Sequence, residues 1–153
     1  MKMPWRVSLA VFFLTWGLNA MAASNNQPVI SASNVVVTLD VFSGRPNPTW
    51  SLSEPTTVEF SRRLHALEAS KVDAPEFDDL GYRAVGAQFQ DQMKGVVVVK
   101  ASRGVVTLEQ GGQRFRYVDP GRQFELWLVN TGAGHVTPDV LQYVTREIAS
   151  KPQ

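Results

Sequence analysis

The chain has 153 residues, of which 44% are hydrophobic and 19% are charged, a composition that suits one folded domain and argues against disorder. Its 15 basic and 14 acidic side chains nearly balance, which argues against a nucleic-acid binder that relies on bulk positive charge. The absence of cysteine excludes disulfides, thiol catalysis and cysteine-bound zinc, and two histidines leave little for a histidine-rich metal centre. We therefore expect neither a metal nor another cofactor.

Residues 1–22 have the pattern of a cleaved secretory signal peptide. Lys2 and Arg6 form a positive N-terminal region, an apolar stretch follows over residues 7–18, and the Ala-Met-Ala sequence at 20–22 offers the small residues that a signal peptidase requires. The apolar stretch is shorter than the roughly 20 residues that span a bilayer. The alternatives are an uncleaved anchor and a buried first helix. The pattern predicts a periplasmic or secreted protein whose mature form has no membrane span.

Residues 23–34 are small and polar, and we interpret them as a flexible lead-in to a single domain over residues 35–150. The domain opens with apolar residues at every second position from Val35 to Val41, which predicts a half-buried strand. The loop 43–48 ends the strand because its two prolines lack backbone donors. A short extended piece that contains Trp50 follows.

A helix is expected next. Ser53 suits the N-cap position, and Phe60, Leu64 and Leu67 recur at the spacing of one helical face. The pattern predicts that this helix ends near Lys71.

The following forty residues have the pattern of a sheet. A continuous apolar run from Val96 to Val99 predicts a central strand that is covered on both faces. Glycine-containing turns at 102–104 and 111–112 are typical of hairpins. The other expected strands are residues 82–89, 105–109 and 113–118.

Two helices are expected to end the domain. Asp119 and Pro120 favour the start of a helix, although the apolar residues from 124 to 128 would fit a strand equally well by their period. Pro138 begins the last helix in the same way. The sequence thus predicts an α+β fold, an antiparallel sheet of four to five strands with two or three helices packed on it. The expected core includes Leu64, Val97, Val99, Trp127 and Leu141.

The loop between the first strand and the first helix is the candidate binding site. Ser43, Arg45, Asn47 and Trp50 would present a hydroxyl, a guanidinium, an amide and an indole on a segment stiffened by proline. Such a loop could hold a carboxylate or phosphate through the arginine and stack a flat group on the tryptophan. The alternative is a purely structural connection, with the arginine paired internally and the tryptophan in the core.

Two segments carry a resemblance to a known group. They are the Phe-Ser-Gly-Arg-Pro-Asn-Pro sequence at 42–48 and the Asp-Pro-Gly-Arg sequence at 119–122, the latter followed by Trp127-Leu128 and Thr131-Gly132. In these segments the chain resembles a group of small exported bacterial proteins of uncharacterised activity. The resemblance therefore implies export and carries over no catalytic or binding residue.

Other charged residues permit weaker interpretations. Arg114 and Arg116 alternate with aromatic residues and would form either a basic strip for an anionic ligand or the solvated face of a sheet. Arg122 and Glu125 are expected to form an ion pair on a helix surface that contributes little to stability. Neither histidine belongs to a recognised nucleophile or metal motif, and no catalytic residue is assigned. The remaining candidates are His65, His135 and a solvated acidic cluster of Glu76, Asp78 and Asp79.

Three functions remain open. The first is an exported non-catalytic domain that binds a protein or a small ligand of the cell envelope, as an inhibitor, an immunity protein or an accessory factor. The second is a small hydrolase in which Asp40 or a histidine is the base and Arg45 holds an anionic substrate. The third is a structural or assembly protein that presents a sheet edge. No nucleic-acid partner is expected.

Overall fold

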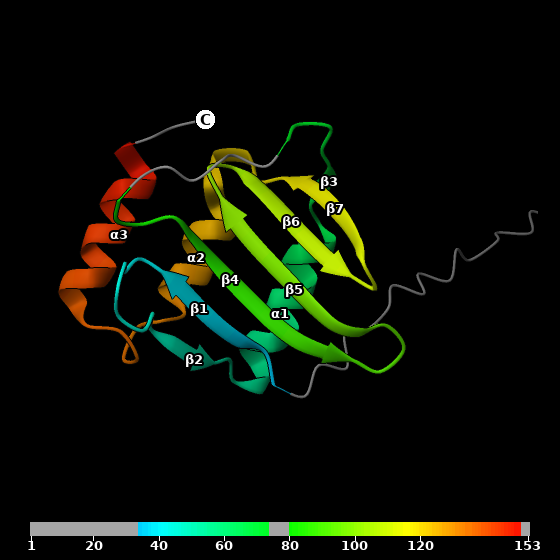
Figure 1. Ribbon diagram of the computed structural model, residues 1–153, viewed down its shortest axis with the longest axis horizontal. Coiled ribbons are helices and arrows are strands. Elements are labelled where there is room, and N and C mark those ends of the chain that lie inside the picture. The colour runs from blue at the N-terminus through cyan, green and yellow to red at the C-terminus, as the bar shows by residue number, and fades with distance from the viewer. Residues whose placement is uncertain (1–33, 74–79, 151–153) are drawn as a thin grey trace, which may run out of the picture.

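A computed structural model describes residues 34–73 and 80–150 of the chain (Figure 1). The signal peptide expected at 1–22, nearly all of the lead-in and the acidic cluster at 76–79 lie outside the described residues. Within the described part, no helix combines the length and the apolar composition that crossing a membrane requires.

The fold is α+β, with a seven-stranded antiparallel sheet in the order β2-β1-β4-β5-β6-β7-β3. The sheet has more strands than the four to five expected, because β2 and β3 are too short to show an alternating pattern in the sequence. The strands are β1 (Val36–Asp40), β2 (Thr49–Ser51), β3 (Glu68–Ala69), β4 (Ala84–Asp91), β5 (Gly95–Ser102), β6 (Val105–Gln110) and β7 (Gln113–Val118).

Three α-helices lie together on one face of this sheet (Figure 1). They are α1 (Glu54–His65), α2 (Gln123–Asn130) and α3 (Pro138–Ser150), and a short 3-10 helix η1 (Pro120–Arg122) precedes α2. The first helix ends at His65 and not near Lys71, because the chain turns there into β3, which pairs with the end of β7.

The core lies between the sheet and the helices. Leu64, Val97 and Val99 are buried as predicted, whereas Trp127 and Leu141 are only partly buried and pack against the core from its margin. Successive residues of a strand point to opposite faces, so every second residue along most of β4 and β5 enters the core. In the two central strands these residues are Val85, Ala87, Phe89, Val97, Val99 and Ala101.

The second face of the sheet is open among the described residues, which corrects the prediction for Val96–Val99. Val96 and Val98 are 51% and 38% exposed, so this strand is covered on one face only. Arg114 and Arg116 also lie on the open face, opposite to Phe115, as predicted for the last strand. An antiparallel sheet can leave one face in water because its hairpin connections need no helix to cross that face.

The segment after β7 is helical, as the capping residues predicted. Asp119 accepts hydrogen bonds from the backbone N–H groups of Phe124 and Glu125, at 2.8 and 2.9 Å, through its two carboxylate oxygens. Gly121 and Arg122 have φ values of 62° and 57°. This tight, left-handed entry places the carboxylate over the first turn of α2 and satisfies donors that a helix N-terminus leaves unpaired.

Candidate functional site

The predicted binding loop uses its asparagine for internal contacts. The side-chain oxygen of Asn47 accepts hydrogen bonds from the N–H groups of Val41 and Phe42, at 3.0 and 2.8 Å. Its Nδ2 donates to Oδ1 of Asp40 at 3.0 Å. The amide therefore closes the loop onto the end of β1 and has little left to offer a ligand.

Asp40 is also engaged by a residue outside the loop. Arg83, which lies just before β4, forms an ion pair with Asp40 and donates to the carbonyl of Phe42 at 3.0 Å. The hydrogen bond from Arg83 is the main reason that the pKa of Asp40 lies below its usual range. A carboxylate with a lowered pKa is a poor general base, which disfavours the role that the hydrolase hypothesis gave to Asp40.

Trp50 belongs to the core and is not open to a ligand. Its side chain is 4% exposed, and its indole N–H donates to Oγ1 of Thr131 at 3.0 Å. A Cβ atom at Gly132 would lie 3.1 Å from two carbons of the indole ring, so only glycine lets the chain pass this close without a shift. The stacking role predicted for Trp50 is therefore wrong, and the structural alternative holds for this residue.

Ser43 and Arg45 are the two predicted site residues that lie at the surface. The guanidinium of Arg45 stacks on Phe42, 3.5 Å from the ring centroid. The internal pairing considered for this arginine is made instead by Arg83. The structure thus does not bring the four predicted residues together around one ligand position.

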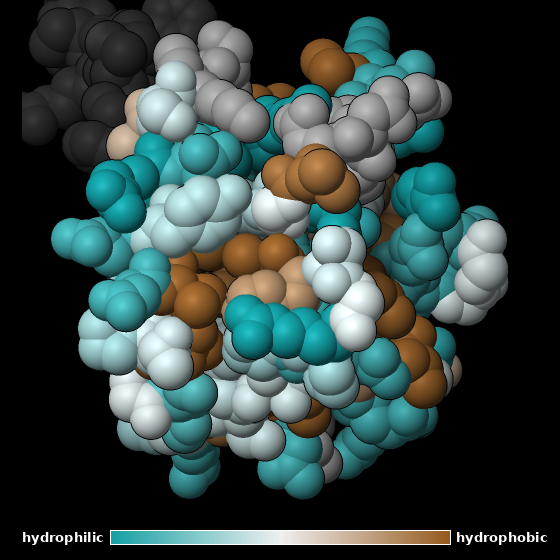
Figure 2. All heavy atoms as spheres, turned by 60° about the vertical axis from the view of Figure 1, so that its left-hand side comes forward, coloured by the Kyte–Doolittle hydropathy of each residue, from teal (hydrophilic) through white to brown (hydrophobic). Residues whose placement is uncertain are grey.

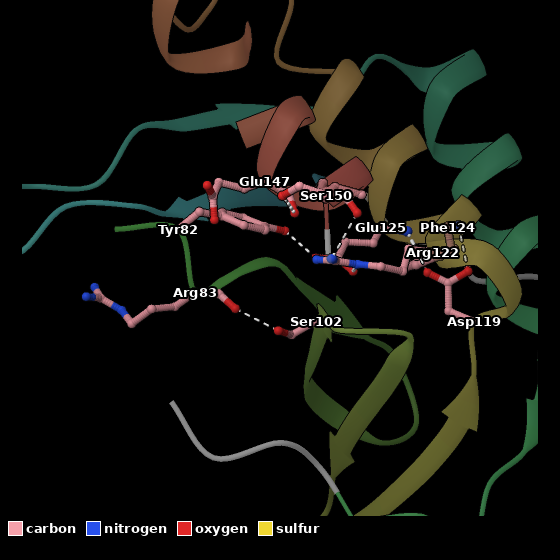
Figure 3. Close-up of polar contacts among 10 residues, drawn as sticks. Tyr82, Arg83, Ser102, Asp119, Arg122, Phe124, Glu125, Glu147 and Ser150 are labelled. Carbon is pink, nitrogen blue, oxygen red and sulfur yellow. Dashed lines mark hydrogen bonds and ion pairs between the residues drawn. The ribbon is translucent and has the colours of Figure 1, made fainter. Parts of the chain in front are cut away.

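The second motif forms a buried polar network, which Figure 3 shows in close-up. Arg122 and Glu125 are 4% and 0% exposed, and two hydrogen bonds of 2.8 Å join the guanidinium to the carboxylate. Arg122 also donates to the carbonyl of Ile148 at 3.1 Å, and the hydroxyl of Tyr82 donates to Glu125 at 2.6 Å. Burial and the neighbouring carboxylate raise the pKa of Tyr82. The prediction that Arg122 and Glu125 form a pair on the helix surface is therefore wrong, because both side chains are buried.

Both motifs of the resemblance are thus explained by folding contacts. The first places Trp50 in the core, and the second supplies Thr131 and Gly132, which receive its ring. Arg122 of the second motif ties α2 to the end of α3. These contacts give the buried residues of both segments a role in folding, whereas Ser43 and Arg45 stay at the surface.

The faces of the molecule differ in the cavities that they offer. Figure 2 brings the α3 side forward and shows hydrophilic side chains around a small group of apolar residues. The cavity between Tyr82, Arg122 and Glu147 holds only about 10 Å³, which is too small for a ligand. Two broader depressions of about 400 and 470 Å³ lie on the open face of the sheet, where the described residues provide no second wall.

A cavity of about 370 Å³ lies on the opposite face, where α1 ends above the sheet, and we name it the α1 pocket. The helix provides one wall and four neighbouring strands provide the floor. Its volume falls in the range of small-molecule sites. It is lined by Leu64, His65, Phe89, Asp91, Lys94, Val97, Leu108, Gln110, Phe115 and Tyr117.

The strand register gives the α1 pocket an apolar end and a polar end. Leu108 pairs with Phe115 in the middle of the floor, and Val97 pairs with Gln110 one step further along. Asp91 and Lys94 lie beyond them, at the turn between β4 and β5. Phe115 remains 41% exposed, because α1 ends before it covers this part of the sheet.

His65 is the pocket residue that most resembles a catalytic group, but among the described residues no hydroxyl is hydrogen-bonded to its free ring nitrogen. Its Nδ1 lies 2.8 Å from the carbonyl oxygen of Ser61 and 3.3 Å from Oγ of the same residue. Since a carbonyl oxygen only accepts, Nδ1 carries the proton of that bond and is not free to take one from the serine hydroxyl. Nε2 is the ring nitrogen left for another partner.

Sequence reasoning missed this pocket, although it had noted His65 and the shared face of Phe115 and Tyr117. The missing information was the strand pairing, which sets these residues beside Phe89 and Leu108. Among the described residues, no group of three histidine, aspartate or glutamate side chains is placed to hold a metal ion. Comparison of the chain with family models, with curated proteins and with solved structures gave no match.

Proposed function

We propose that the protein is an exported, non-catalytic binding domain that holds the apolar part of its ligand in the α1 pocket. The observation that carries the proposal is the arrangement of this pocket, in which aromatic and aliphatic side chains form the floor and a few polar groups gather at one end. Ligand sites in proteins commonly have this composition. The signal-peptide pattern of residues 1–22 supports export.

The pocket offers binding free energy through apolar contact. Removal of apolar surface from water contributes about 25 cal/mol per Å². Phe115 is partly open to water in the free protein, so a ligand that covers it would gain from this effect. Phe89 and Val97 are buried in the core, and Leu108 and Tyr117 pack against it, which keeps the apolar floor formed before the ligand arrives.

The surroundings of the three candidate bases favour binding over hydrolysis, and one of them, His135, is an exposed residue outside the α1 pocket. Asp40 is held by Arg83 and Asn47, and the Nδ1 of His65 is held by the Ser61 carbonyl. Asp40 is thus already engaged, and among the described residues no hydroxyl is hydrogen-bonded to Nε2 of His65, so neither site assembles the nucleophile–base pair that hydrolysis requires. The third function, presentation of a sheet edge, has less support. The two edge strands are β2 and β3, which have only three and two residues and so offer a partner strand little to pair with.

A titration with neutral alcohols tests the binding function. We expect 1-hexanol, 1-heptanol and 1-octanol to bind with affinity that rises about fourfold per added methylene, because each buried methylene contributes about 0.8 kcal/mol. Amide chemical shifts should change for residues that line the α1 pocket and for few others. The dissociation constant can be followed from the same spectra.

Two tryptophan variants on one strand provide the matched control. Leu108→Trp should fill the α1 pocket and abolish alcohol binding, whereas Thr107→Trp, on the open face of the same strand, should leave it unchanged. Equal binding by both variants, or shift changes spread over the open face, would contradict the proposal. Export is tested separately by N-terminal sequencing of protein from the cell envelope, which should begin at or near Ala23.

A further inference from the structure

We propose that the ligand of the α1 pocket is an amphiphilic anion, with its apolar body on the aromatic floor and its anionic group beside Lys94. The inference rests on the proposed function and adds the chemical class of the ligand. It follows from the way in which charged and apolar side chains are divided between the two ends of the pocket.

The apolar end fixes the position of the ligand body. Leu64 closes the pocket from α1, while Leu108, Phe115 and Tyr117 form the floor on β6 and β7. These side chains offer no strong hydrogen-bonding group except the tyrosine hydroxyl. A charged group placed among them would lose its hydration without a partner, which is costly. His65 also lines the pocket, but with the proton on Nδ1 its Nε2 is an acceptor in the neutral ring and offers an anion no donor. The charged end of an anionic ligand is therefore expected at the turn between β4 and β5.

The two charged residues at that turn differ in how they are used. Asp91 accepts hydrogen bonds from the N–H groups of Met93 and Lys94 through Oδ1, at 2.9 and 2.8 Å, so its carboxylate closes the turn. Lys94 is exposed and forms no ion pair with any residue of the described ranges. Asp91 therefore has a structural role in the turn, whereas the ammonium group of Lys94 is available to a ligand.

Gln110 completes the polar end. It lines the pocket from the end of β6, and its amide can donate to an anion while the ammonium group of Lys94 supplies the charge. A fatty acid or an aryl carboxylate has the required chemistry. Because the carboxylate of Asp91 is engaged by the turn, the ammonium group of Lys94 should make ligand selectivity depend on the sign of the ligand charge.

Three probes with the same eight-carbon chain test the inference: octanoate, 1-octanol and octylammonium. We expect octanoate to bind at least about threefold more tightly than 1-octanol, as one partly exposed ion pair allows, and octylammonium to bind most weakly. An equal affinity for octanoate and 1-octanol would overturn the anion preference and leave the proposed function standing. Tightest binding of octylammonium would overturn it in favour of Asp91. Failure of all three probes would overturn the proposed function itself.

Lysine variants assign the preference to one residue. Lys94→Gln should reduce octanoate affinity to that of 1-octanol and leave 1-octanol binding unchanged. Lys71→Gln, which removes a positive charge from an exposed position outside the pocket, should leave both affinities unchanged. A similar loss of octanoate affinity in both variants would show a general effect of net charge and would overturn the role of Lys94.

Discussion

Arg122 and Glu125 form a two-point ion pair inside the protein, one turn apart at the start of α2. Their side chains are joined by two hydrogen bonds of 2.8 Å, and neither is open to solvent. The pair also reaches two other parts of the chain, since Arg122 bonds to Ile148 and Tyr82 bonds to Glu125. The polar groups are thus satisfied together, which is the condition under which a buried ion pair is tolerated.

Removal of one member of this pair should destabilise the fold strongly. Glu125→Gln removes the carboxylate charge that two hydrogen bonds join to the buried guanidinium of Arg122, and we expect a loss of about 3–5 kcal/mol in the free energy of unfolding. Replacement of both residues, as in Arg122→Met with Glu125→Leu, should cost less, because no unpaired charge remains. Urea unfolding of the single and double variants measures both values. A single-variant loss below about 1 kcal/mol would contradict the role given to the pair.

The contact between Trp50 and Thr131 gives a second stability prediction. Thr131→Val preserves the shape of the side chain but removes the acceptor of the indole N–H, and we expect a loss of about 1–3 kcal/mol. Thr131→Ser keeps the hydroxyl and should lose less. Thermal and urea unfolding of the two variants give the comparison. If Thr131→Val were as stable as Thr131→Ser, the hydrogen bond would have no measurable weight.

The Asp40–Arg83 pair should make stability depend on pH in the acid range. The pKa of Asp40 is lowered in the folded protein, so its contribution to stability is complete above the unfolded pKa of about 3.9 and is lost as the pH falls through the folded value. Asp40→Asn should therefore be less stable than the natural protein at pH 7. The difference in the free energy of unfolding should shrink as the pH falls below about 4. A difference that stays constant between pH 7 and pH 2 would contradict this linkage.

Arg45 and Arg83 should respond differently to truncation, although both lie near Phe42. Arg45→Ala removes an exposed side chain whose described contact is with one ring, and we expect a change within about 0.5 kcal/mol. Arg83→Ala leaves Asp40 without its counter-ion and the Phe42 carbonyl without this donor, so it should lower the melting temperature clearly. Circular dichroism melts of the two proteins make the comparison.

Arg45→Ala also serves as a control for binding in the α1 pocket. Octanoate binding in the α1 pocket should be unaffected by Arg45→Ala, because the residue does not line the pocket. A large fall in melting temperature would instead make Arg45 part of the scaffold. The variant therefore shows whether Arg45 contributes to folding or to pocket binding.

The elements with strong local signals were predictable from the sequence. The alternation from Val35 to Val41 and the capping residues before α2 and α3 correctly indicated a strand and two helices. The short strands β2 and β3 were not separable from loops, because two or three residues cannot show a period. Their existence depends on the neighbouring strands with which they pair.

The identity of the site could not be predicted in the same way. The loop at 43–50 was predicted to be the binding site because its polar and aromatic residues are close together in the sequence. In the structure, Asn47 and Trp50 instead make internal contacts. The α1 pocket draws its lining from α1 and from four strands, β4 to β7. Its residues are unremarkable one by one, and their proximity depends on a register that contacts between distant segments establish.

The sequence by itself therefore determined the order of the main elements, the α+β class and, in the alternating first strand, which face is apolar. Local periodicity and capping chemistry are sufficient for these, because they act between residues a few positions apart. Only the tertiary structure decided that Arg122 and Glu125 are buried, that one face of the sheet stays open and that α1 ends short of Phe115. Burial depends on which elements cover a residue, and that is settled by packing between distant segments of the chain.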